Sequence, residues 1–161
     1  MILKIALANS IFVAAFLIIL KQTNKKTRSI LKKDIKIPES KGIYIGVARE
    51  KNEESQIMEW NAYLINDRDI TIEMILIVSK GFDKEIKTSK MRHTVKELQA
   101  KSFAKIEFLQ EEVLSLTNEF AVTYFADGKM YERTFVFPEN SIQESQLKEL
   151  PIIKTQGILK K

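Results

Sequence analysis

The sequence predicts an all-β protein: an antiparallel β-sandwich of immunoglobulin-like or fibronectin-like type with about seven strands, preceded by an N-terminal apolar helical segment. Two observations lead to this prediction. From position 42 onward, apolar side chains alternate with polar ones, which is the pattern of half-buried strands. The length of 161 residues suffices for one core, so we expect one domain, residues 35–140, between an N-terminal segment, residues 1–34, and a C-terminal tail, residues 141–161.

The first half of the domain holds three expected strands. Alternating apolar side chains mark residues 43–47 and residues 60–64. The polar residues 66–69 suit a turn, so we expect the second strand to form a hairpin with the third, residues 70–78. The apolar face of this third strand comprises Ile70, Ile72, Met74, Leu76 and Val78.

Two further strands are expected in the middle of the domain, near residues 86–93 and over residues 104–108, followed by a loop around Glu111 and Glu112. After Ser141 the apolar residues are scattered, and we expect a tail that lies along the sandwich or stays mobile. The apolar face of the strand over residues 104–108 comprises Ala104, Ile106 and Phe108.

A last hairpin gives the strongest local pattern in the chain. Residues 120–125 and residues 130–137 both alternate, and Asp127 and Gly128 lie between them. This dipeptide suits the positive φ angles of a tight hairpin turn. We expect Pro138 to end the final strand, because proline cannot donate to a strand ladder.

The formal net charge of +5 is unevenly distributed. Residues 1–34 hold seven basic residues and one acidic residue, whereas between positions 84 and 105 seven basic residues face only Glu85 and Glu97. If this second group gathers on one face, it makes a patch that can contact phosphates or a partner; the alternative is a solvated loop and an edge strand protected by lysines. The candidate contact residues are Lys84, Lys87, Lys90, Arg92, Lys96, Lys101 and Lys105.

Met1 to Leu20 is almost continuously apolar, and the basic run of residues 21–33 follows it. One interpretation is a membrane anchor, whose positive flank holds the domain in the cytoplasm. A cleaved signal peptide fits less well, because the positive charge follows the apolar run. A third interpretation is a start-site artefact, in which residues 1–30 are not translated and the native protein begins near Ile30 or Leu31.

The inventory of chemically active residues argues against catalysis. The chain has no cysteine, which excludes disulfides, thiolate metal ligands and thiol nucleophiles. The single histidine, His93, lies in a basic stretch with no acidic residue beside it, and we expect it on the surface. Clustered metal ligands and a glycine-rich phosphate loop are missing, so we predict no catalytic residue, no cofactor and no metal site.

The aromatic residues are spaced along the expected strands and are therefore predicted to fill the core. Tyr63, Tyr124 and Tyr131 fall opposite some of the other aromatic positions, so an outer binding face formed by these tyrosines is a second interpretation. The remaining strand aromatics are Trp60, Phe120, Phe125, Phe135 and Phe137.

Three stretches carry a resemblance to known proteins: WNAYLIN at residues 60–66, KSFAKIEFLQ at 101–110 and YFADGK at 124–129. From Leu31 to Lys161 the chain resembles a family of short bacterial β-sandwich proteins of unknown function, often labelled phenylalanyl-tRNA synthetase alpha subunit. The resemblance implies a start near Leu31. A class II synthetase needs ATP-clamping arginines and a glycine-rich strand, and the sequence, with five glycines, has neither motif, so no catalytic residue is carried over.

These observations favour a cytoplasmic, non-catalytic protein-interaction module with an unidentified protein partner. One alternative is an RNA-associated or translation-related protein that holds phosphates with the basic residues of positions 84–105. The other is a single-pass membrane protein with its domain in the cytoplasm, if Met1 to Leu20 is an anchor. We predict no enzyme activity.

Overall fold

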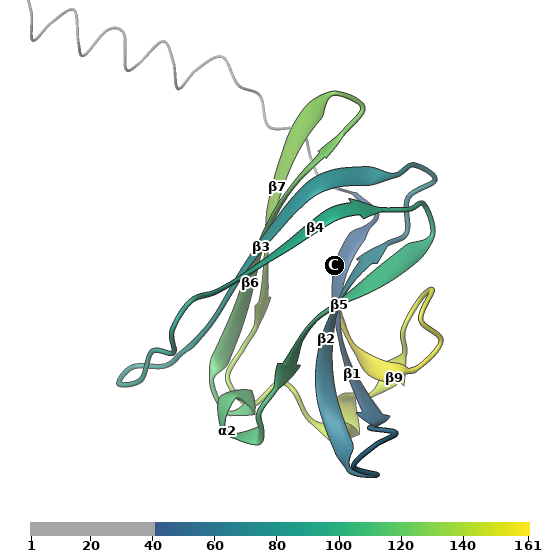
Figure 1. The fold of residues 1–161 in the computed structure, drawn as a ribbon. Coiled ribbons are helices and arrows are strands. Elements are labelled where there is room, and N and C mark those ends of the chain that lie inside the picture. The colour runs from purple at the N-terminus through teal and green to yellow at the C-terminus, as the bar shows by residue number, and fades with distance from the viewer. Residues whose placement is uncertain (1–40) are drawn as a thin grey trace, which may run out of the picture. The chain divides into compact units, whose positions relative to one another are not determined.

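A computed structural model describes residues 41–161 of the chain. Within them, nine β-strands form two antiparallel sheets that pack face to face (Figure 1). The predicted all-β sandwich is confirmed, whereas the predicted N-terminal helical segment lies outside the described residues. The elements are β1 (Ile43–Lys51), β2 (Met58–Asn66), β3 (Ile72–Phe82), β4 (Met91–Leu98), β5 (Ser102–Leu109), α2 (Glu111–Leu114), β6 (Thr117–Ala126), β7 (Lys129–Phe137), the short 3-10 helix η1 (Glu144–Gln146), β8 (Lys148–Glu149) and β9 (Gln156–Lys160).

The chain crosses between the sheets at Asn66, the last residue of β2. β2 lies in the five-stranded sheet, with strand order β5-β2-β1-β9-β8, and β3 lies in the four-stranded sheet, with order β4-β3-β6-β7. The predicted hairpin of the second and third strands is therefore wrong. The buried Asn66 side chain explains the difference, because its Nδ2 donates to the carbonyl oxygens of Ile70 (2.9 Å) and Gln99 (2.8 Å) and so fixes a corner instead of a hairpin turn.

A β-bulge in β3 changes which side chains face the core. The register with β6 shifts by one residue between Glu73 and Leu76, and Met74 has a φ of 47°. One inserted residue moves all following side chains to the opposite face of a strand. The predicted apolar face is therefore wrong beyond Ile72: Ile75 is buried, while Met74 is 60% and Leu76 38% exposed.

The core between the sheets is rich in aromatic side chains, as predicted. Trp60 and Phe120 are buried in it, and the rings of Tyr124 and Tyr131 stack inside it with centroids 5.1 Å apart. Tyr63 packs in a second buried cluster on the outer side of the five-stranded sheet. An outer binding face made of these tyrosines is ruled out, because none of them is more than 8% exposed.

The residues after Ser141 complete the five-stranded sheet. β9 pairs with β1, and β8 pairs with β9, so the described chain has nine strands where the sequence predicted about seven. The β8–β9 turn folds over the outer side of the sheet. There Leu150 is 1% exposed and packs against Ala48, Tyr63 and Ile65.

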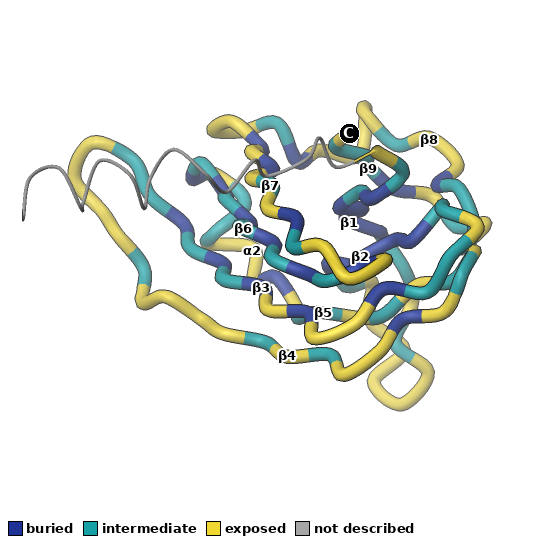
Figure 2. Tube along the Cα trace, turned by 90° about the horizontal axis from the view of Figure 1, so that it is seen from above, coloured by how far each residue is buried: buried dark blue, intermediate teal, exposed yellow. Residues whose placement is uncertain are grey.

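β4 begins later in the chain than predicted. The strand expected over residues 86–93 starts at Met91. The Asp83 carboxylate fixes a turn before it, because Oδ1 accepts hydrogen bonds from the backbone N–H groups of Glu85 (2.7 Å) and Ile86 (2.6 Å). β4 is an edge strand of the four-stranded sheet and is largely exposed along its length (Figure 2).

The last hairpin is confirmed. Asp127 and Gly128 have φ angles of 49° and 68°, as in a type I′ turn, and join β6 to β7, which ends just before Pro138. The loop predicted at Glu111 and Glu112 is instead the first turn of the short helix α2.

Two glycines should differ sharply in their tolerance of a methyl group. A Cβ on Gly157 would lie 2.7 Å from the Val47 carbonyl oxygen and 2.6 Å from Leu150 Cδ1, whereas a Cβ on Gly46 meets only side-chain ends at 3.0 Å. Because backbone cannot move aside, we expect Gly157→Ala to lower the free energy of unfolding by about 2 to 3 kcal/mol and Gly46→Ala by less than about 1 kcal/mol. Urea denaturation measures both; equal losses would contradict this packing of the β8–β9 turn.

Candidate functional site

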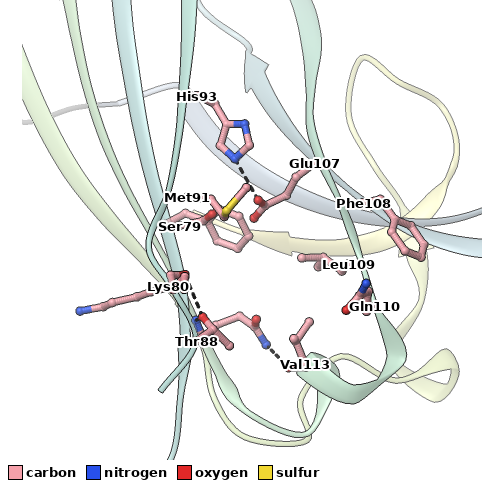
Figure 3. A pocket seen from close by; sticks show the side chains of 14 residues that line it. Ser79, Lys80, Thr88, Met91, His93, Glu107, Phe108, Leu109, Gln110 and Val113 are labelled. Atoms are coloured by element: carbon pink, nitrogen blue, oxygen red, sulfur yellow. Dashed lines mark hydrogen bonds and ion pairs between the residues drawn. The ribbon is translucent and has the colours of Figure 1, made fainter. Parts of the chain in front are cut away.

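The open side of the sandwich holds a cleft between β4 and β5. β4 is an edge strand of the four-stranded sheet and β5 an edge strand of the five-stranded sheet. Within residues 41–161, each therefore has one edge without a strand partner. A short turn at residues 99–101 joins them, and toward the other end they enclose a cavity of about 400 Å³, seen in Figure 3. We call this cavity the β4–β5 cleft. Its lining includes Thr88, Met91, His93, Glu107, Leu109 and Phe120.

A histidine and a glutamate join the two walls of the cleft. His93 Nε2 on β4 lies 2.9 Å from Glu107 Oε2 on β5, and the two side chains are 21% and 16% exposed. His93 is thus half-buried and has an acidic partner, unlike the open surface position predicted for it. Sequence neighbours could not reveal this partner, because it lies on the edge of the other sheet.

A register irregularity in β5 turns Glu107 into the cleft. The pairing with β2 shifts between Ala62 and Tyr63, so that Glu107 is opposite the core residue Ala62. The predicted apolar face of this strand is wrong at its end, because Phe108 is 49% exposed while Leu109 is buried. No sequence signal marks the pair, because alternation places Glu107 on the polar face of the strand and only the register shift turns it inward.

The middle of the cleft is apolar. Leu109 and Phe120 form its buried floor, at 5% and 1% exposure, and Met91 stands over it with 53% of its surface exposed. Figure 3 shows Met91 between the two walls and Phe108 directed away from the cavity. Apolar surface next to unpaired strand edges suits binding of an extended chain.

The polar side chains at the other end of the cleft hold its walls. Thr88 Oγ1 accepts a hydrogen bond from the Gly81 N–H at 2.8 Å. Asn118 Nδ2 donates to the carbonyl oxygens of Val113 (2.7 Å) and Leu116 (3.0 Å). The Thr88 hydroxyl and the Asn118 Nδ2 group therefore fix the β3–β4 hairpin and the α2 region.

The seven predicted contact residues are distributed over four parts of the molecule. Lys84, Lys87 and Lys90 are exposed on the β3–β4 hairpin next to the cleft, and Arg92 and Lys96 are exposed along β4. The other two lysines lie on the β4–β5 turn and on β5. The seven basic residues therefore do not gather on one face of the molecule.

Lys101 is engaged with carboxylates at the end of the sandwich opposite the β3–β4 hairpin. Its Nζ lies 3.1 Å from Asp67 Oδ1 and 3.3 Å from Asp69 Oδ1. The hydrogen bond to Asp67 raises the pKa of Lys101. Its positive charge is thus locally balanced.

Lys105 lies on the outer side of the five-stranded sheet in acidic surroundings. It borders a depression that also contains Glu50 and Glu59. There the Glu50 Oε1 accepts hydrogen bonds from Asn61 Nδ2, at 2.8 Å, and from the Tyr63 hydroxyl. Burial raises the pKa of Tyr63, and the hydrogen bond and charge of Glu50 raise it further.

Comparisons of the chain with family models, with curated proteins and with solved structures find no match. Residues 41–161 contain no group of three or more histidine and carboxylate side chains arranged to hold a metal ion. In the same residues no helix is long and apolar enough to cross a membrane. The predicted anchor, Met1 to Leu20, lies outside the described part of the chain.

The buried Tyr63 hydroxyl should make the protein sensitive to alkaline pH. Because its pKa is raised in the folded state, the folded protein holds this proton more tightly than the unfolded chain does, and the free energy of unfolding falls as the pH rises above about 10. Tyr63→Phe should reduce this slope, measured by urea denaturation across alkaline pH, while Lys101, whose pKa is also raised, keeps its own contribution. Glu50→Gln should reduce the slope only in part, since burial is the larger cause; an unchanged slope in Tyr63→Phe would contradict the assignment.

Proposed function

We propose that the chain is a non-catalytic protein-interaction module whose β4–β5 cleft binds an extended apolar segment of a partner protein. One observation carries this proposal: a mainly apolar cavity lies between two strand edges that have no strand partner in the described residues. A segment entering the cleft gains main-chain hydrogen bonds to a strand edge and packs its side chains on Leu109 and Phe120.

The fold type that we infer agrees with this role. In the lettering used for immunoglobulin-like and fibronectin-like domains, β1, β2 and β5 take the places of strands A, B and E, and β4, β3, β6 and β7 those of C′, C, F and G. The β4–β5 cleft then corresponds to the open side between strands C′ and E. Sandwiches of this kind host many binding functions on their edges and loops.

Two features of the cleft support binding over catalysis. His93 has its Nε2 committed to Glu107, and among residues 41–161 no hydroxyl forms a hydrogen bond with its ring. The Thr88 and Asn118 side chains are committed to backbone groups. A nucleophile and its base need to be within hydrogen-bonding reach, and the cleft does not offer that arrangement.

RNA binding is less well supported as the main function. It requires a continuous positive surface that follows a phosphate backbone. Lys101 pairs with Asp67 and Asp69, and Lys105 lies among glutamates, so only the basic residues of the β3–β4 hairpin and β4 lie near one another.

A cytoplasmic location of the protein remains a prediction made from the sequence.

The cleft proposal predicts a specific peptide-binding behaviour. We would select ligands for the full-length chain from a phage-displayed library of short random peptides and measure their affinity by isothermal titration calorimetry. Selected peptides should be rich in apolar and β-branched residues. Met91→Asp should weaken their binding by at least about tenfold, because it places a carboxylate against the apolar centre of the contact.

Met74→Asp is the matched control, since Met74 is also an exposed methionine of a strand but does not line the cleft. It should leave the affinity unchanged. Amide NMR shifts caused by a selected peptide should be confined to β4, β5, the end of β3, α2 and the start of β6. Peptides that shift other strands instead, or that bind Met91→Asp as tightly as the wild type, would refute the proposed site.

A further inference from the structure

The outer face of the four-stranded sheet is apolar at its centre and uncovered by residues 41–161. Met74, Leu76 and Val136 are 60%, 38% and 40% exposed there. The five-stranded sheet differs, because the β8–β9 turn covers its outer face with Leu150. Half-buried apolar residues extend the face between these positions, namely Val78, Ala121, Phe125 and Met130.

Charges of opposite sign flank this apolar centre on the two edge strands. Arg92 and Lys96 are exposed on β4, at one edge, and Glu132 is exposed on β7, at the other. Thr94 lies midway between the two basic residues, at the same level of the sheet as Glu132. The row that crosses the sheet at this level consists of Thr94, Leu76, Thr123 and Glu132.

We propose that this face is the interface of a homodimer, in which two copies pack sheet against sheet about a two-fold axis parallel to the strands. Such an axis places β4 of one copy over β7 of the other at the same level. Glu132 of one copy then lies between Arg92 and Lys96 of the other, and the symmetry makes this contact twice. Aligned packing of two sheets buries the apolar centre between them.

Four other charged residues of the face lie away from the contact of Glu132 with Arg92 and Lys96. Lys80 Nζ and Glu119 Oε1 neutralise each other within one copy at 2.8 Å. Glu73 and Glu97 are neighbours at the level of Phe125 and Met130, beyond Lys96, so in the dimer Glu97 lies over Met130 and Glu73 over Phe125 of the other copy, at the end of the face. A partner of single charge sign would meet repulsion at one of the two edges, whereas a second copy meets attraction at both.

Charge reversal tests the pairing directly. Sedimentation equilibrium of the full-length chain should show a reversible dimer. Arg92→Glu and Glu132→Arg should each weaken dimerisation by at least about tenfold, because each turns two symmetric attractions into repulsions. The triple variant Arg92→Glu, Lys96→Glu and Glu132→Arg should recover most of the wild-type affinity, since all three charges again face their opposites.

Lys148→Glu and Glu112→Arg provide matched controls, because they reverse exposed charges on β8 of the other sheet and on α2, and they should leave the dimer intact. A monomer at every concentration would overturn the proposal. If Arg92→Glu and Glu132→Arg dimerise as tightly as the wild type, association takes place through another part of the chain. That result would overturn the proposal as well. Two weakened single variants without recovery in the triple variant would refute the two-fold arrangement. The Met91→Asp peptide test does not depend on any of these results.

Discussion

The side-chain amide of Asn66 fixes the end of the sandwich on which both proposed surfaces depend. Its Nδ2 donates to the carbonyl oxygens of Ile70, Leu98 and Gln99, and its Oδ1 accepts the Arg68 N–H. One buried residue thereby ties together the crossing from β2 to β3 and the crossing from β4 to β5. Burying such groups unpaired costs about 1 to 3 kcal/mol each, so the arrangement is strongly favoured once the core forms. The closed end of the β4–β5 cleft is a consequence.

The bulge at Met74 decides what the four-stranded sheet presents to each side. Without the inserted residue, Met74 and Leu76 would continue the inward face begun by Ile72, and Ile75 would point outward. With the inserted residue, Ile75 joins the core, and Met74 and Leu76 lie on the outer face. The apolar centre of that face is thus produced by one local backbone irregularity, which lies on a strand paired on both sides and is therefore held in place.

The sequence predicted features that depend on neighbouring residues, and it missed features that depend on contacts between distant parts of the chain. Strict alternation located β1 and β2, and Asp127 with Gly128 located the β6–β7 hairpin, because these signals act within a few residues. The sheet to which a strand belongs depends on Asn66 reaching the carbonyl of Gln99, far along the chain. The His93–Glu107 pair was invisible for the same reason: it joins edges of two sheets, and only the folded topology brings them together.

The outer faces of the two sheets differ in whether another segment of residues 41–161 covers them. On the five-stranded sheet the glycines at 46 and 157 leave room for Leu150, so the β8–β9 turn can lie directly on the strands and bury Tyr63 and Ile65. The four-stranded sheet has no such cover within residues 41–161, although its outer side is also apolar. Exposed apolar area is unfavourable in water, and a face that combines it with edge charges of both signs gains most from a partner carrying the same pattern in reverse. Among candidate partners, a second copy related by a two-fold axis carries that reversed pattern by symmetry.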